Sequence, residues 1–188
     1  MDFYKVTNQY FFKIWKKVCK EDEENLFKIF DSKSDYTNFI LKKDNCIIDK
    51  IAEELKLKIY KEYYHTDAVF YEQKDIFVSK SKYNTWGTRE DFCLKQIKIA
   101  FEHENNFQTA YQEVIHLLTT NADKKILVTY AKKENTKNHA EDFCKIIEGI
   151  KNNEPKILVI FGSIIKDEKK LEWKCYELRK NGPKEIFV

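Results

Sequence analysis

The sequence predicts an α/β fold in which a mixed β-sheet is flanked by helices on both sides. Apolar residues recur with helical spacing in some segments, and they alternate or cluster in short runs in others. The two kinds of segment also follow one another along the chain. A strand–helix–strand succession in the middle implies a parallel pair of strands joined by a right-handed crossover.

Length and composition predict one globular domain over residues 1–188. A chain of this size buries roughly 70% of its unfolded surface, so it folds without disulfides or structural metals. Apolar residues make up 43% and aromatic residues 15%, which argues against disorder. With four glycines and two prolines, the chain has no Pro/Gly-rich linker that would divide it.

Charge and cysteine usage predict a soluble cytoplasmic protein. The 34 basic and 31 acidic residues nearly cancel, so bulk charge neither requires nor excludes a nucleic-acid partner. The five cysteines lack C-x-x-C spacing, which argues against structural zinc, and their odd number suits reduced thiols. No export signal and no apolar run of about 20 residues is found, so we expect no membrane association.

The first third of the chain is predicted to be helical. Residues 6–20 carry apolar side chains at helical spacing, with Thr7 as a candidate N-cap. A short helical turn is expected at residues 26–30. Residues 45–57 form a third amphipathic segment, for which Asp44 is the candidate N-cap.

Beyond this point the apolar period changes from 3.6 to 2, which predicts strands separated by helices. Gly162 and Ser163 are interpreted as a turn, residues 84–88 as a loop, and the last strand as an edge strand. The predicted strands are residues 59–64, 68–71, 76–79, 96–104, 125–130, 156–161 and 171–178, and the predicted helices are residues 108–119 and 140–151.

Two carboxylates end the strand predicted at residues 96–104. Residues two apart in a strand point to the same face, so Glu102 and Glu104 project together from a strand built to be buried. Their repulsion and desolvation are costly, and a divalent cation removes both penalties. The alternative is that both are solvated charges on an exposed strand end.

A third carboxylate, Asp67, interrupts a run of aromatic and β-branched residues. If its strand lies next to the strand that ends in Glu102, Asp67 reaches the same ion. The alternative is that Thr66 and Asp67 begin a turn.

These residues resemble the PD-(D/E)xK nuclease superfamily, which has the restriction-endonuclease-like fold. The resemblance covers about residues 45–130, where a helix bearing Glu and a strand bearing Asp67 precede a strand ending in Glu102-x-Glu104, a helix and a further strand. It implies a metal-dependent nuclease that hydrolyses DNA phosphodiester bonds, with Asp67 and Glu102 as ligands of Mg²⁺ (Mn²⁺ as a substitute) and a homodimeric assembly. Glu104 stands where the superfamily usually has Lys, and some restriction enzymes similarly carry Glu there. It would act as general base or outer ligand.

Further residues are candidates for supporting this site. Acidic or amide side chains on neighbouring helices are Glu53, Glu54, Gln112 and Glu113. Basic and aromatic residues suited to phosphate contact and base stacking are Lys80, Lys82, Trp86, Arg89 and Lys95. An ordinary solvated loop explains this second group equally well. Lys98 and Lys124 are candidates for the missing positive charge.

Two other functions stay open. Glu104 in place of Lys favours a non-catalytic member of the fold that binds nucleic acid or a protein partner. In the second, the chain is an interaction protein without a metal, and its interface is the aromatic face of the first helix, formed by Tyr10, Phe11 and Trp15. His103 is expected on the core side of its strand and His116 as a packed or solvated helix residue.

Overall fold

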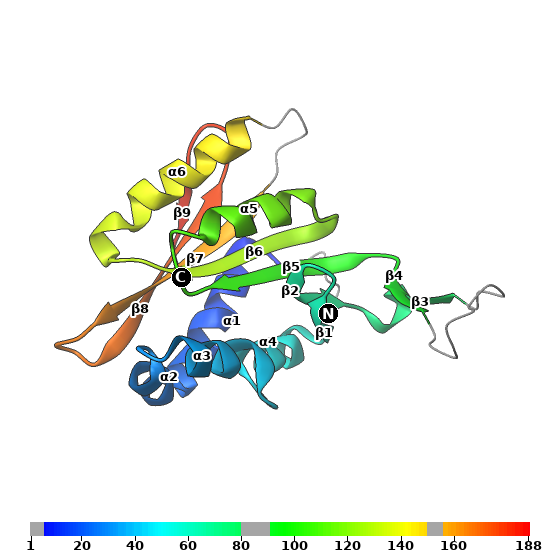
Figure 1. Cartoon of the computed structure of the whole chain (residues 1–188), viewed down its shortest axis with the longest axis horizontal. Helices are drawn as coiled ribbons and strands as arrows, with labels where there is room; N and C mark the ends of the chain where they lie inside the picture. Colours follow the sequence, from blue (N-terminus) through cyan, green and yellow to red (C-terminus); the bar gives the residue numbers. More distant parts are fainter. Residues whose placement is uncertain (1–5, 80–90, 150–155) are drawn as a thin grey trace.

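The computed structural model describes residues 6–79, 91–149 and 156–188, and its centre is a seven-stranded mixed sheet (Figure 1). Strands β5, β6 and β7 are parallel neighbours, and all other neighbours are antiparallel. The predicted α/β class with a mixed sheet is therefore confirmed. In spatial order the strands are β1 (Lys58–Tyr63), β2 (Thr66–Tyr71), β5 (Ile97–Glu104), β6 (Ala122–Tyr130), β7 (Ile157–Ile165), β8 (Lys170–Leu178) and β9 (Lys184–Ile186).

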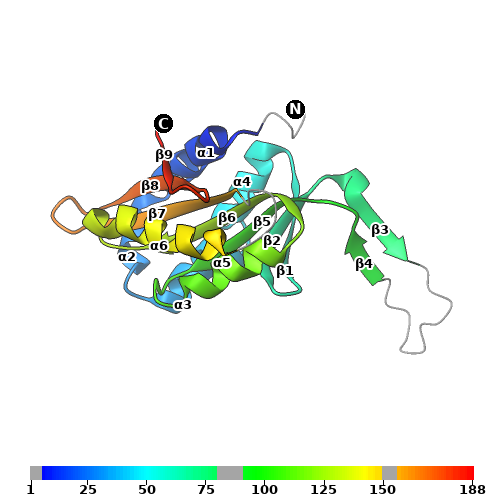
Figure 2. The same ribbon diagram turned by 90° about the horizontal axis from the view of Figure 1, so that it is seen from above.

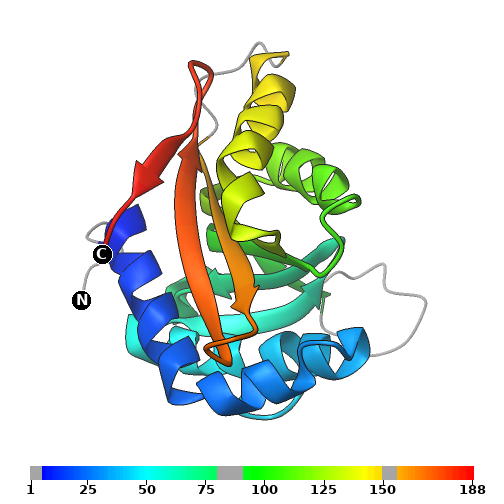
Figure 3. The ribbon, with the colours of Figure 1, turned by 90° about the vertical axis from the view of Figure 1, so that its left-hand side faces the viewer.

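Helices cover both faces of this sheet (Figure 3). One face packs against the N-terminal helices α1 (Asn8–Glu21), α2 (Glu23–Ile29), α3 (Lys33–Thr37) with the π-helical turn Asn38–Lys42, and α4 (Ile47–Leu55). The other face packs against α5 (Ala110–Thr119) and α6 (Thr136–Glu148), the helices that connect β5 to β6 and β6 to β7.

Alternation along the central strands divides the core into two apolar layers. On β5, Ile99 and Phe101 pack against the layer of α1 to α4, while Ala100 between them packs toward α5 and α6. Because side chains point alternately to the two faces, a strand buried on both sides is apolar without interruption. Any charged residue on such a strand is then conspicuous.

The first helix begins as predicted, and two of its three candidate interface aromatics pack into the core. Thr7 Oγ1 accepts a hydrogen bond from the backbone N–H of Tyr10 at 3.0 Å. Phe11 and Trp15 are fully buried against the sheet, and Trp15 packs edge-on against Trp173. Phe11 and Trp15 are therefore not accessible to a partner, because the tertiary fold already covers them, whereas Tyr10 is half-buried.

The N-cap predicted for the third amphipathic segment is also wrong. Helix α4 begins two residues later than Asp44 would require, with Cys46 as its N-cap. The Asp49 carboxylate accepts a hydrogen bond from the Cys46 backbone N–H at 3.2 Å. A side chain in the first turn of the helix thus satisfies the backbone N–H of the residue that caps it.

Two predictions at the C-terminal end of the chain need correction. Gly162 and Ser163 lie inside β7, and β8 is not an edge strand because β9 pairs with it. A Cβ at Gly162 would lie 2.6 Å from the ring of Tyr130 and 2.8 Å from that of Trp173. Two aromatic rings therefore lie close against the backbone at this glycine, and the position is not a turn.

A two-stranded arm, β3 (Ile76–Ser79) and β4 (Asp91–Leu94), leaves the sheet between β2 and β5. It projects away from the body of the molecule (Figure 2). The 3₁₀ turn Gln73–Asp75 leads into it. The loop predicted at residues 84–88 lies outside the described residues.

Candidate metal centre

Asp67 and Glu102 lie side by side on adjacent strands. In the antiparallel pairing of β2 with β5, Ala68 is opposite Phe101, which places Asp67 across from Glu102. The Asp67 backbone N–H donates to Glu102 Oε2 at 3.2 Å. The backbone N–H of His103 donates to Asp67 Oδ2 at 2.8 Å. The structure thus brings together the two carboxylates that the sequence assigned to one site.

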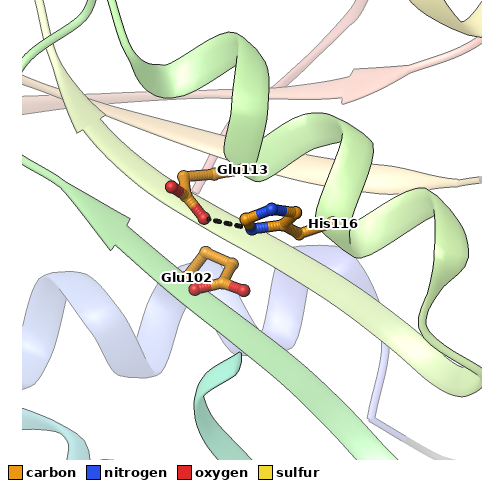
Figure 4. A group of neighbouring side chains, drawn as sticks. All are labelled: Glu102, Glu113 and His116. Carbon is orange, nitrogen blue, oxygen red and sulfur yellow. Dashed lines mark hydrogen bonds and ion pairs between the residues drawn. The ribbon is translucent and has the colours of Figure 1, made fainter. Parts of the chain in front are cut away.

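Helix α5 adds two groups to this pair. Glu113 and His116 are three residues apart and point down toward β5, with His116 Nδ1 3.1 Å from Glu113 Oε2 (Figure 4). One potential ligand atom from each of Glu102, Glu113 and His116 lies within 4.8 Å of the others. This spacing brings two carboxylates and an imidazole around one point, as a metal ion requires.

Burial makes Glu102 the most perturbed member of the cluster. Its side chain is 2% exposed, and burial, followed by the neighbouring charge of Asp67, raises its pKa to about 9. Among the described residues, no hydrogen-bond partner is found for its buried Oε1. A buried carboxylate oxygen without a donor is costly unless a proton or a cation satisfies it.

The other acids respond to the same environment. Burial also raises the pKa of Asp67, against the hydrogen bond from His103 and the charge of Lys42, which lower it. Burial also raises the pKa of Glu113, whereas the hydrogen bond and charge of His116 lower it. Each of these carboxyls is destabilised as an anion, so a divalent cation would relieve all of them at once. The donor set fits such an ion.

Glu104 lies beside the cluster but is engaged locally. Its Oε1 accepts a hydrogen bond from the backbone N–H of Asn106 at 2.6 Å, in the turn that follows β5. Its charge nevertheless raises the pKa values of Asp67 and Glu113. Glu104 is therefore close enough to act on the cluster electrostatically, while one of its oxygens holds the turn.

The other acidic or amide residues proposed from sequence lie elsewhere. Glu53 and Glu54 are exposed on α4, which packs on the opposite face of the sheet, and Glu54 pairs with Lys17 at 2.7 Å. Gln112 is exposed on α5. Glu53 and Glu54 lie away from the site because helical spacing does not show which face of the sheet a helix covers. Gln112 points to solvent from the same helix that contributes Glu113.

Neither lysine considered as a source of positive charge has its ammonium group placed at this cluster. Lys98 is buried on β5, and its Nζ lies 3.6 Å from Asp123 and 3.7 Å from Glu72. Lys124 Nζ donates to Asn8 Oδ1 at 3.4 Å. The cation whose charge acts on Asp67 is Lys42, from the π-helical turn.

Most residues predicted to contact nucleic acid lie outside the described residues: Lys80, Lys82, Trp86 and Arg89. Lys95 is described. It is exposed at the base of the arm, with Nζ 5.9 Å from the centre of the Phe77 ring.

Of the two histidines considered from the sequence, His103 lies in the core and His116 lies at the site. His103 faces the core as predicted, where Nε2 lies 2.9 Å from the Tyr130 hydroxyl, and burial lowers its pKa to about 3. His116 was not expected at the site. The signal that could have found it is its spacing from Glu113, because residues three apart share a helix face.

Comparison with known proteins identifies no relative. No protein-family model, curated protein or solved structure matches the chain. Within the described residues, no helix has the length and apolar character needed to span a membrane.

Proposed function

We propose that this protein is a metal-dependent nuclease that hydrolyses DNA phosphodiester bonds, with a core of restriction-endonuclease-like type. The observation that carries the proposal is the buried carboxylate of Glu102, which has one oxygen without a hydrogen-bond partner among the described residues and which lies with Glu113 and His116 in a group that could hold a metal ion. The element order supports it: helix α4, strands β1 and β2, strand β5, helix α5 and strand β6 come in the order that the resemblance implies, with the arm β3–β4 inserted between β2 and β5.

The ligands of the ion would be Glu102, Glu113 and His116, whose ligand atoms lie within 4.8 Å of one another, with Asp67 beside Glu102 as a further candidate. A bound Mg²⁺ or Mn²⁺ would supply a Lewis acid for the phosphate and lower the pKa of a coordinated water. Imidazole suits Mn²⁺ better than Mg²⁺, which prefers oxygen ligands, so His116 favours activity with Mn²⁺.

The remaining chemistry falls to groups beside the ion. Glu104 is the side chain that could accept a proton from the attacking water, since it lies beside the cluster and is not among the ligands. His103 contributes through its backbone N–H, which fixes the orientation of the Asp67 carboxylate. DNA as the partner and a homodimer as the working assembly follow from the resemblance and belong to this proposal.

Cleavage of DNA is the direct test. The full chain is incubated with linear duplex and single-stranded DNA in Mg²⁺, in Mn²⁺ and in chelator, and Glu102→Gln is compared with wild type. We expect ion-dependent cleavage that falls at least about 100-fold in Glu102→Gln, as loss of a group that stabilises the transition state predicts. Glu53→Gln is the matched control, because Glu53 is an exposed acid on the other face. Its activity should equal that of wild type.

Ion binding can be measured without activity. At tenfold excess over its dissociation constant, an ion bound only by the native state stabilises it by about 1.4 kcal/mol. We expect Mn²⁺ to raise the melting temperature of wild type but not of Glu102→Gln, and more strongly at pH 8 than at pH 6. The pH dependence follows because the ion displaces the proton that Glu102 holds up to a pKa of about 9.

The second candidate is a non-catalytic member of the same fold that binds nucleic acid or a protein partner. The Glu at position 104, with its hydrogen bond to Asn106, favours it because the usual lysine is replaced by a residue that holds a turn. DNA binding that is equal in wild type and Glu102→Gln, with no cleavage in either ion, would support this candidate over the nuclease.

A further inference from the structure

A pocket of about 420 Å³ opens beside the candidate metal centre. One wall is the β1–β2 hairpin and the other is the C-terminal half of α5. Its lining is mixed, with tyrosine rings on the hairpin side and hydroxyl and imidazole groups on the helix side. The residues that matter for the argument are Tyr63, Tyr64, His65, His116, Thr119 and Thr120.

The hairpin displays aromatic rings to solvent. Tyr64 is 78% exposed, and its ring meets that of Tyr63 at 90° with centroids 4.8 Å apart. The Tyr63 hydroxyl accepts a hydrogen bond from the Leu94 backbone N–H at 3.3 Å, which ties it to the base of the arm. One ring is therefore held in place while its neighbour offers an open face.

The backbone of the hairpin is held in an unfavourable conformation. Glu62 and Tyr64 have φ values of 56° and 54°, in the left-handed region that residues other than Gly, Asn and Asp rarely adopt. Such conformations persist where the surrounding structure stabilises them, and they gather at binding and catalytic sites. Here they present the exposed ring of Tyr64 at the mouth of the pocket.

His116 connects the pocket to the metal centre, because it lines the one and belongs to the other. A ligand held by both would place an anionic group at the cluster and a planar apolar group between the tyrosines and α5. A nucleotide has this form, with a phosphate and a base a few ångströms apart. Base stacking on an aromatic side chain contributes about 1–3 kcal/mol and tolerates any sequence.

We propose that this pocket takes one unpaired nucleobase, stacked on Tyr64, from a DNA strand whose phosphate lies at the metal centre. The inference rests on the proposed nuclease function and names its substrate class. A paired base is already stacked within the duplex, so entry requires a single-stranded segment or a base flipped out of the helix. The expected substrate is therefore single-stranded DNA or a duplex with an unpaired segment.

Binding in a cleavage-blocked background tests this directly. The full chain carrying Glu102→Gln is titrated into a short single strand containing the fluorescent base 2-aminopurine, and into the matching duplex. We expect fluorescence quenching with the single strand, and about a tenfold loss of its affinity when Tyr64→Ala is added. Tyr64→Phe should retain the affinity, since stacking needs the ring and not the hydroxyl. Duplex affinity should change less than about twofold.

Phe187→Ala is the matched control, because Phe187 is 72% exposed and is not among the residues that line the pocket. It should leave single-strand affinity unchanged. If Tyr64→Ala and Phe187→Ala bind the single strand as tightly as the parent, the pocket proposal is overturned even where wild type cleaves DNA. If affinity depends on Tyr64 but wild type cleaves no DNA, the base pocket stands and the nuclease proposal fails.

Discussion

Strand β5 carries two buried charged side chains on the same face, Lys98 near its beginning and Glu102 near its end. The two are exposed by 1% and 2%, so burial does not distinguish them. Their surroundings do. Three carboxylates surround the ammonium of Lys98: Glu72 at 3.7 Å, Asp75 at 3.9 Å and Asp123 at 3.6 Å.

Glu102 has the opposite environment. Burial raises its pKa, its acidic neighbours Asp67 and Glu113 raise it further, and its Oε1 has no hydrogen-bond partner among the described residues. The comparison shows that burial of a charge is not by itself a sign of function, because Lys98 is compensated from within the protein. Glu102 is balanced by a bound proton, as its raised pKa indicates, or by a cation that takes the place of the proton.

Replacement of Lys98 should have the largest effect on stability. Lys98→Met removes the only buried lysine among the described residues and leaves Asp75 buried at 5% exposure without it. Breaking a buried ionic group by removing one partner costs about 3 kcal/mol or more. Urea unfolding at pH 7 checks this. A change below about 1 kcal/mol would mean that the three carboxylates do not depend on Lys98, and that the two ends of β5 are not so different.

Replacement of Glu102 should instead increase the stability of the metal-free protein. Its folded-state pKa of about 9 lies above its ordinary value of 4.5, so the native state holds a proton that the unfolded state releases. Stability of the metal-free protein therefore falls as pH rises from 4.5 to 9. Glu102→Gln removes that loss, and we expect it to stabilise the protein by on the order of 2 kcal/mol at pH 8 in chelator.

The window for this measurement is set by His103. Burial lowers its pKa to about 3 from an ordinary value of 6.5, so its contribution to stability is present above pH 6.5 and is lost as pH falls. Glu102 and His103 thus oppose each other below pH 6.5, and Glu102 dominates above it. Urea midpoints at pH 6.5 and 8.5 should differ in wild type and converge in Glu102→Gln. If the urea midpoint changes between these pH values by the same amount in both proteins, Glu102 is not the group whose titration changes the stability.

The smallest effect is expected at Lys42, the cation that acts on Asp67. Lys42 pairs with Glu62 at 3.1 Å, but the two side chains are 54% and 72% exposed. Exposed pairs contribute little, so Lys42→Met should change the free energy of unfolding by less than about 0.5 kcal/mol. Chelator-treated protein in urea gives the measurement. A loss of 2 kcal/mol would identify Lys42 as the partner that compensates the acidic cluster, and the contrast with Lys98 would disappear.

Periodicity in the sequence determined the elements and the faces of their side chains. Strand alternation predicted that Glu102 and Glu104 share a face and that His103 points the other way into the core. Helical spacing and a capping residue predicted where the first helix begins. These features depend on residues within a few positions of each other, so local physical chemistry is sufficient to predict them.

Only the tertiary structure decided which elements meet. It placed β2 beside β5, so that Asp67 reached Glu102, and it laid α5 over them, so that Glu113 and His116 completed the cluster while Gln112 did not. It also enclosed Lys98 among three carboxylates from two separate segments, the 3₁₀ turn after β2 and the start of β6. Such pairings join residues tens of positions apart and depend on the packing of whole faces, which no local period specifies.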